Sequence, residues 1–134
     1  MLPVKSVMIV DDAMLMRTVI KGLVESSGRY RVVNTSENGQ RALEAIRSQE
    51  PDIILLDIEM PVMDGIEFLR HARLRTRARI VVLSSVAGAG APRALEARRL
   101  GADAVLQKPS GSVSVDVGGS LGEDLLKTLE RICP

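Results

Sequence analysis

The chain of 134 residues has almost no aromatic side chains, since Tyr30 and Phe68 are the only two and tryptophan is absent. Proteins that bind single-stranded nucleic acid stack bases on aromatic rings, so this composition disfavours that class of function. The formal net charge is only +1, so no overall field attracts nucleic acid or an acidic membrane. We therefore expect neither nucleic acid nor a membrane among the partners.

Cysteine and long apolar runs are equally scarce. The single cysteine, Cys133, has no second cysteine to pair with, which excludes a disulfide framework and favours a reducing cytoplasm. No apolar run approaches the ~20 residues that a membrane-spanning helix needs. The stretch from Met1 to Lys5 lacks the pattern of a signal peptide. With 46% hydrophobic and 26% charged residues, the composition predicts an ordinary globular domain.

What the chain does contain is a regular alternation of apolar runs and amphipathic segments. Short runs rich in branched residues predict buried strands at Ser6–Val10, Tyr30–Ser36, Asp52–Asp57, Arg79–Ser84 and Ala104–Gln107. Amphipathic patterns predict helices over 15–24, Arg41–Gln49, a segment begun by Asp64 as N-cap, Pro92–Leu100 and Leu121–Ile132. This alternation favours an α/β fold, with a doubly wound five-stranded parallel sheet covered by five helices.

Four of the predicted strands run into polar residues that suit one kind of chemistry. The first strand ends at Asp11 and Asp12, the third at Asp57, the fourth at Ser84 and the fifth at Lys108. In a parallel sheet these ends meet at one edge, where ligands bind. Three carboxylates suit Mg²⁺, which prefers oxygen ligands. Asp57 can then accept a phosphoryl group as nucleophile, while Lys108 neutralises its charge and Ser84 donates a hydrogen bond to it.

The motifs that carry these residues resemble a known family. In chain order they are Val10-Asp11-Asp12, the segment Leu55–Gly65, Leu83-Ser84-Ser85, Gly101-Ala102-Asp103 and Lys108-Pro109. Together they are similar to the receiver domain of two-component response regulators, although each motif alone is unspecific. The resemblance implies a flavodoxin-like fold with strand order 2-1-3-4-5. It also implies that a phosphohistidine of a histidine kinase phosphorylates Asp57.

The resemblance further implies a set of ligands for the site. Asp12, Asp57 and the backbone carbonyl of Glu59 are expected to bind Mg²⁺, with Asp11 acting through water. Lys108 and Ser84 are expected to contact the phosphoryl group. The Lys108–Pro109 peptide bond is expected to be cis, because X–Pro is the only bond for which that isomer has a low energy cost.

A narrower resemblance concerns the later loops. The segments 84–91, 108–111 and 114–116 are similar to the receiver of chemotaxis protein-glutamate methylesterases, in which the receiver restrains a C-terminal hydrolase. The expected organisation is a receiver core over 1–110, a loop or excursion over 110–120, and the last helix with the start of a possible linker over 121–134. The chain itself is then expected to be a regulatory domain and not an enzyme.

Two residues depart from, or add to, the receiver pattern. Val105 stands three positions before the pocket lysine, where receivers commonly have an aromatic residue, so the usual coupled movement of hydroxyl and ring needs another carrier. Glu59 adds a carboxylate two positions after Asp57, and we expect it to influence how water reaches an acyl phosphate.

Two alternative functions stay open from the sequence. The chain could be a stand-alone regulator that acts by binding proteins through its fourth helix, fifth strand and fifth helix. It could also be an aspartate-based phosphatase, because such enzymes need a second carboxylate at the spacing of Glu59 from Asp57 to act as acid and base.

Two further patterns receive a structural interpretation. The segment Gly118–Gly122 matches G-x-S-x-G, but the only histidine, His71, precedes it, so a catalytic triad in the required order is impossible. Ser120 and Glu123 are instead expected to cap the last helix. The arginines between 70 and 79 are interpreted as a solvated helix end and loop in preference to a nucleic-acid patch.

Overall fold

The structure is a computed structural model that describes residues 3–85, 91–108 and 117–134, with side chains described except at 117–120. Its strands are β1 (Lys5–Val10), β2 (Tyr30–Ser36), β3 (Ile53–Asp57), β4 (Arg79–Ser84) and β5 (Ala104–Gln107). Its helices are α1 (Met14–Glu25), α2 (Gly39–Ser48), α3 (Gly65–Ala72), α4 (Pro92–Arg99) and α5 (Val117–Ile132). All strand pairs are parallel, in the order β2-β1-β3-β4-β5. The predicted α/β fold and its strand order are confirmed.

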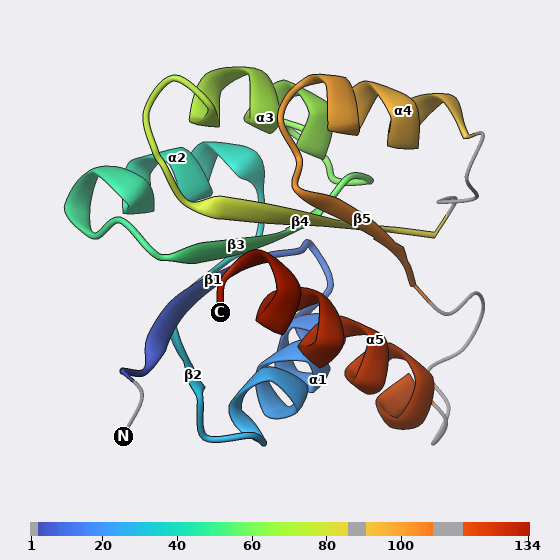
Figure 1. Cartoon of the computed structure of the whole chain (residues 1–134). Helices are drawn as coiled ribbons and strands as arrows, with labels where there is room; N and C mark the ends of the chain where they lie inside the picture. Colours follow the sequence, from blue (N-terminus) through green and yellow to red (C-terminus); the bar gives the residue numbers. More distant parts are fainter. Residues whose placement is uncertain (1–2, 86–90, 109–116) are drawn as a thin grey trace.

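Helices cover both faces of this sheet. Figure 1 shows α2, α3 and α4 above the sheet and α1 and α5 below it. The central strands are buried on both faces, and alternate residues point to opposite layers. Met8 and Val10 of β1 pack in the layer under α2, α3 and α4. Val7 and Ile9 of the same strand pack in the layer with α1 and α5. This explains why the central strands β1, β3 and β4 contain continuous apolar runs.

The predicted start of α5 is wrong. The helix begins at Val117, four residues before the expected Leu121. Ser120 therefore lies inside the helix and cannot be its N-cap, so the predicted capping box with Glu123 is wrong as well. The first turn contains two consecutive glycines, which have low helix propensity, so the sequence pattern did not predict that this turn is helical. The G-x-S-x-G segment is helical along its length, which is incompatible with the turn that a nucleophile elbow needs.

Helix starts elsewhere follow the predicted chemistry more closely. The Asp64 side chain accepts a 2.9 Å hydrogen bond from the backbone N–H of Glu67, which confirms Asp64 as the N-cap of α3. Helix α2 begins two residues earlier than expected, at Gly39, because Asn38 caps it by accepting from the backbone N–H of Arg41.

Several expectations fall on segments that the structure does not describe. The Lys108–Pro109 peptide bond, the Gly-rich segment 88–90 and most of the expected loop at 110–120 lie outside the described residues. Among the helices in the described part of the chain, none is both long and apolar enough to cross a membrane.

Candidate functional site

The register of the sheet brings the polar strand ends to one edge. Val10 of β1 pairs with Leu56 of β3, so the next residues, Asp11 and Asp57, follow neighbouring strands at the same level. On the other side, the backbone N–H of Lys108 donates to the carbonyl of Ser84 at 2.9 Å, which aligns the ends of β4 and β5. Four strands therefore contribute to one site, as the sequence predicts.

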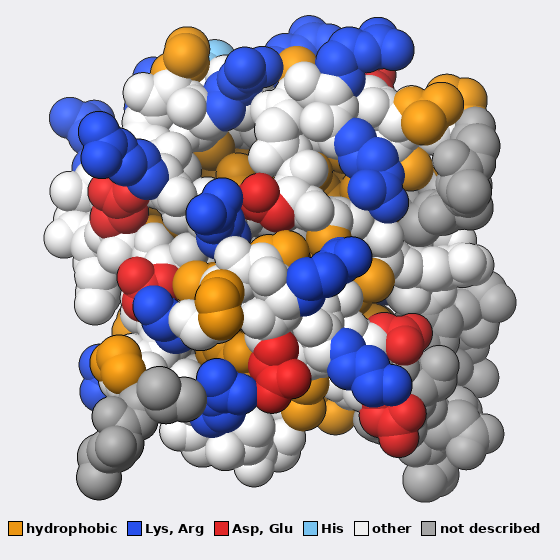
Figure 2. Space-filling view, viewed as in Figure 1, with side chains coloured by type: hydrophobic (Ala, Val, Ile, Leu, Met, Phe, Trp, Pro, Cys, Tyr) orange, Lys and Arg blue, Asp and Glu red, His pale blue; other side chains and the backbone are white. Residues whose placement is uncertain are grey.

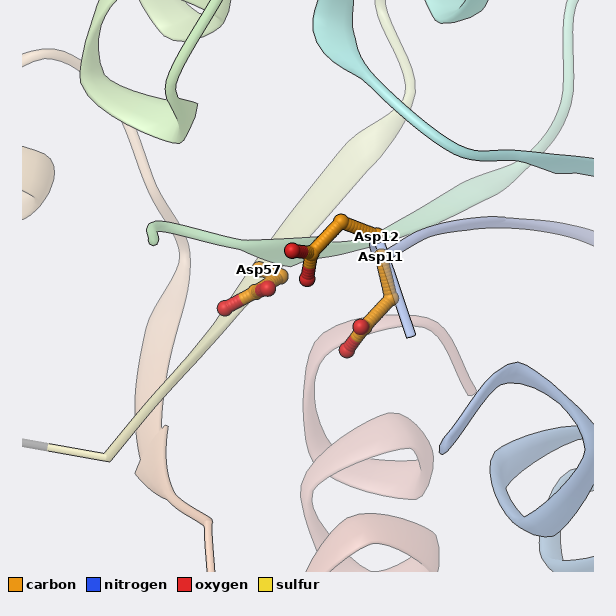
Figure 3. Close-up of side chains that lie close together, drawn as sticks. All are labelled: Asp11, Asp12 and Asp57. Atoms are coloured by element: carbon orange, nitrogen blue, oxygen red, sulfur yellow. The ribbon is translucent and has the colours of Figure 1, made fainter. Parts of the chain in front are cut away.

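Three carboxylates form the centre of the site. One carboxylate oxygen from each of Asp11, Asp12 and Asp57 lies within 4.8 Å of the other two, and Figure 3 shows how the three side chains lie. Asp11 and Asp57 are buried, whereas Asp12 is exposed. Gathering three acidic groups at one point is unfavourable unless a cation joins them. The donor set consists of hard oxygens with one open side, and it therefore fits a magnesium ion.

Lys108 is the cation that the structure shows beside these groups. Its ammonium lies 2.6 Å from Asp11 Oδ2 and 3.1 Å from Asp57 Oδ1. Burial alone would lower the pKa of Lys108, but its contacts with Asp11 and Asp57 outweigh that effect and raise the pKa. The lysine is therefore charged at neutral pH and holds the two buried carboxylates together.

Asp57 has an unusual protonation equilibrium. Burial raises the pKa of its carboxyl to about 7, and the nearby Asp11 adds to the shift, while Lys108 opposes it. A buried carboxylate has an unfavourable free energy when no cation is near it. A divalent cation therefore stabilises the charged form of a buried carboxylate more than that of an exposed one. The electrostatics of the site therefore favour a cation next to Asp57.

Ser84 and Glu59 form a second contact at the same edge. The Ser84 side chain is buried, and its Oγ donates a 2.7 Å hydrogen bond to Glu59 Oε1. The backbone N–H of Glu59 donates to Asp57 Oδ1 at 3.2 Å. Burial would raise the pKa of Glu59, but the hydrogen bond from Ser84 and other contacts outweigh it, so the pKa is lowered and the side chain is a carboxylate.

Sequence reasoning missed one residue of the site, and the structure places the departure at Val105 that the sequence had shown. Arg17 of α1 was missed: it donates to the backbone carbonyl of Asp11 at 2.7 Å and so fixes the turn after β1. Its place in an amphipathic helix gave no signal of this contact. Val105, at the position of the usual aromatic residue, is partly buried and packs against the layer under α2, α3 and α4.

Comparison with known families gives one match over most of the chain. The family described as the response regulator receiver domain matches residues 7–115. This segment contains every strand of the sheet except the first two residues of β1, and all the residues of the acidic site.

Among curated proteins, similar sequences carry one recurring name. A protein-glutamate methylesterase/protein-glutamine glutaminase from Syntrophomonas wolfei is 39% identical over 129 residues, which cover 96% of this chain and 36% of that protein. Another from Halalkalibacterium halodurans is 44% identical over 111 residues, covering 83% of this chain and 32% of that protein. The chain thus spans about a third of the length of these relatives.

Solved structures agree with this likeness. The response regulator domain of Thermotoga maritima CheB has a TM-score of 0.89 and 34% identity, covering 96% of this chain and 95% of that one. A chain from the crystal structure of the P1 domain of CheA3 in complex with CheY6 from R. sphaeroides has a TM-score of 0.76 and 50% identity, with coverage of 96% and 98%.

Proposed function

The chain belongs to the response regulator receiver domain family, and from this premise we propose that it accepts a phosphoryl group on Asp57 from the phosphohistidine of a histidine kinase. The observation that supports this is the convergence of three acidic side chains within 4.8 Å, with the ammonium of Lys108 at 3.1 Å from Asp57. Carboxylate nucleophile, cation and hydroxyl donor are the groups that phosphoryl transfer to an aspartate needs.

Mg²⁺ is the proposed cofactor. Asp12, Asp57 and the backbone carbonyl of Glu59 would hold it, and Asp11 would contribute through water. When bound, the ion offsets the negative charge of the carboxylates and of an incoming phosphoryl group. The cluster of Asp11, Asp12 and Asp57 supports this assignment.

The proposed reaction is an exchange of one phosphoryl bond for another. A carboxylate oxygen of Asp57 attacks phosphorus, the bond from phosphorus to the histidine nitrogen breaks, and the nitrogen keeps the electron pair. The products are an aspartyl phosphate and a histidine. Lys108, which already contacts Asp57, pairs with the new negative charge, and Ser84 donates its hydroxyl to a phosphoryl oxygen. Because Asp57 is buried, water, which competes as an acceptor of the phosphoryl group, has limited access to the site.

The proposed output is regulation of a protein-glutamate methylesterase in a chemotaxis system of the cytoplasm. The names of the curated relatives, together with the match to the CheB response regulator domain, support this output. Because α5 begins at Val117, the proposed division is a receiver core over 1–110 and, after the connection that follows it, a last helix that leads toward a linker. Phosphorylation can shift the output only by the energy difference between two states, typically ~1–3 kcal/mol.

The test is phosphorylation in solution. The purified chain is incubated with Mg²⁺ and acetyl phosphate, or with a phosphorylated histidine kinase, and intact mass is measured. We expect a single phosphoryl adduct that base removes and that Asp57→Asn abolishes. The exposed Asp124→Asn on α5 is the matched control and should be phosphorylated normally.

Three outcomes would contradict the proposal. They are no adduct, an adduct that persists in Asp57→Asn, or steady turnover of p-nitrophenyl phosphate, which would favour the aspartate-based phosphatase.

A separate measurement tests the metal: Mg²⁺ should raise the melting temperature of the wild type, and Asp12→Asn should lose most of that increase. The alternative of a stand-alone regulator predicts a different result, in which a partner protein binds the phosphorylated chain and no methylesterase domain takes part.

A further inference from the structure

Residues 70–99 carry charge of almost one sign. This segment holds eight of the 18 basic residues of the chain and only one of its 17 acidic residues, Glu96. All eight basic residues are arginines, namely Arg70, Arg73, Arg75, Arg77, Arg79, Arg93, Arg98 and Arg99. The whole chain has a net charge of only +1, so the remaining residues are acidic on balance. The basic character is therefore local to one part of the molecule.

The fold brings seven of these arginines to the region where α3 and α4 end, whereas Arg93 lies at the start of α4 beside Asp64. Helices α3 and α4 lie next to each other on the same face of the sheet (Figure 1). They end shortly before β4 and β5 begin, and the backbone N–H of Ile80 in β4 donates a 2.8 Å hydrogen bond to the carboxylate of Asp103, the residue before β5. Figure 2 shows Lys and Arg side chains gathered over this part of the molecule, at the top of the view.

Three of the eight arginines already have acidic partners. Arg70 pairs with Glu96 at 2.8 Å, Arg93 with Asp64 at 3.1 Å, and Arg79 with Asp103 at 3.7 Å. The other five, Arg73, Arg75, Arg77, Arg98 and Arg99, are exposed and form no salt bridge among the residues that the structure describes, although Arg77 interacts electrostatically with Glu50.

Helix termini account for only part of this excess, namely Arg73 at the end of α3 and Arg98 and Arg99 at the end of α4. A basic residue in the last turn of a helix interacts favourably with the helix dipole, but the effect fades within that turn. Arg75 and Arg77 lie beyond the end of α3, in the connection to β4. Leu74, between two of the arginines, is 84% exposed, and a large apolar side chain gains nothing from this position in the isolated chain. We call the five exposed arginines without a salt bridge, together with Leu74, the arginine face.

We propose that the arginine face is a docking surface for an acidic segment of a partner protein, with an apolar side chain of that segment packed on Leu74. Guanidinium groups bind carboxylates through two parallel hydrogen bonds, and arginine is enriched in protein interfaces while lysine is depleted. Arg70 and Arg79, in the same region, already pair with carboxylates.

A protein partner suits this surface better than nucleic acid does. Base stacking requires exposed aromatic rings, and both aromatic residues, Tyr30 and Phe68, are buried. An exposed leucine adds nothing to the recognition of phosphate groups, but it adds apolar contact area to a protein interface. The surface therefore offers charge and a central apolar contact together.

The arginine face lies at the opposite edge of the sheet from Asp57. Its arginines precede β4 and β5, whereas Asp57 and Ser84 end their strands. A partner docked there leaves the phosphorylation pocket open. The inference therefore goes beyond the proposed phosphorylation and does not depend on it.

The experiment is fluorescence anisotropy at about 150 mM salt, where exposed charges are screened as in the cell. The probes are a fluorescein-labelled peptide that repeats Glu-Glu-Leu, the same peptide with Gln in place of Glu, and a labelled single-stranded DNA of equal charge. We expect the full chain to bind the acidic peptide and neither of the other probes. The triple variant Arg73→Gln, Arg75→Gln, Arg99→Gln should weaken binding about tenfold, as expected for the loss of three exposed ion pairs. Leu74→Ser should weaken it about threefold.

A matched control removes the same charge from elsewhere. Lys21, Arg31 and Lys127 are exposed and have no ion-pair partner among the described residues, so their replacement by Gln should leave peptide binding unchanged. Asp57→Asn should also bind as the wild type, which separates this test from that of the phosphorylation. Thermal melting confirms that each variant is folded.

Four results would overturn the proposal. The first is the absence of peptide binding by the wild type. The second is an equal loss of binding in the control triple variant, and the third is tighter binding of the DNA than of the peptide. The fourth is unchanged binding in Leu74→Ser, since the surface would then be a plain polyanion-binding patch.

Discussion

Ser84 donates its buried hydroxyl to the carboxylate of Glu59 at 2.7 Å, which joins the end of β4 to the loop after β3. A hydroxyl has one proton to donate. If Ser84 binds a phosphoryl oxygen on Asp57, it must therefore release Glu59, and the Glu59 carboxylate then faces a second negative group. The Ser84–Glu59 contact thus favours the unphosphorylated state.

Glu59→Ala should consequently raise the rate at which acetyl phosphate phosphorylates Asp57, by about three- to tenfold. The substitution releases the Ser84 hydroxyl and removes one negative charge from the approach of an anionic donor. We also expect the rate of phosphoryl loss to change, because we propose that Glu59 influences how water reaches the acyl phosphate. Both rates can be measured by intact-mass sampling over time.

The control is Glu44→Ala, which removes an exposed carboxylate from α2. It should leave both rates unaffected. Unchanged uptake and unchanged loss in Glu59→Ala would show that the contact with Ser84 has no part in the phosphorylation equilibrium.

Gly65→Ala should destabilise the chain and impair phosphorylation. A Cβ at Gly65 would lie 2.6 Å from the carbonyl oxygen of Asp57 and 2.7 Å from Cα of Ile58, and these backbone atoms cannot move without shifting the acidic site. We expect a loss of about 1–3 kcal/mol in the free energy of unfolding. Urea denaturation measures the stability, and phosphate uptake reports on the site.

Gly22 offers a matched control for this substitution. It lies in the exposed part of α1, and a Cβ there meets nothing within 4 Å. Gly22→Ala should stabilise the helix by about 0.5–1 kcal/mol. Equal effects at the two glycines would show that close packing against Asp57 is unimportant.

The sheet could be predicted from sequence almost residue by residue. The bounds of β2, β4 and β5 agree with prediction. For β4 the reason is that a buried parallel strand is a short, continuous apolar run with polar ends, whereas β2 is an edge strand with polar residues along its length. The start of α5 could not be predicted in the same way. Its first turn contains Gly118 and Gly119, whose low helix propensity gives no local signal of the helix that forms.

The candidate site was predictable to the level of the backbone. Strand ends in a parallel sheet meet at one edge, so the proximity of Asp11, Asp57 and Lys108 followed from the spacing of the motifs. The partners of Ser84 and Arg17 did not follow. These contacts depend on the rotamers of long side chains and on the shape of a loop, which periodicity does not encode.

Val62 should be replaceable with a gain in stability. It has a φ of 68°, and the backbone N–H of Met63 donates to the carbonyl of Pro61 at 2.7 Å, so Val62 is the centre of a γ-turn of the strained type. Its side chain is 81% exposed and contributes little packing. Val62→Gly should stabilise the chain by about 0.5 kcal/mol, the balance of relieved strain and greater freedom when unfolded.

The control at this position is Val62→Ala, which keeps a Cβ and therefore most of the strain. It should give no gain in urea denaturation. A gain of the same size in both variants would mean that loss of the exposed apolar side chain, and not the backbone conformation, is responsible.

Glu50 should make stability depend on pH in the acid range. Its carboxylate accepts 2.8 Å hydrogen bonds from the Thr76 hydroxyl and from the backbone N–H of Arg77, which hold its pKa below the ordinary value. A lowered pKa means that the unfolded chain binds a proton first, so the contribution is present above pH about 4.5 and is lost as pH falls further. Glu50→Gln should therefore be less stable than the wild type at pH 7, with the difference shrinking toward pH 3. Glu44→Gln, exposed on α2, should show no such convergence.

Lys108→Met should be the most damaging of these substitutions in the absence of metal. The lysine side chain is only 12% exposed and contacts both Asp11 and Asp57, so its loss leaves two buried carboxylates without a cation. We expect the free energy of unfolding to fall by about 3 kcal/mol. Mg²⁺ should then stabilise the variant more than it stabilises the wild type, because the ion supplies the missing positive charge.

The control is Lys127→Met, which replaces an exposed lysine on α5 and should change stability by less than about 0.5 kcal/mol with or without Mg²⁺. Equal responses of the two variants to Mg²⁺ in thermal melting would show that the acidic cluster does not bind the ion.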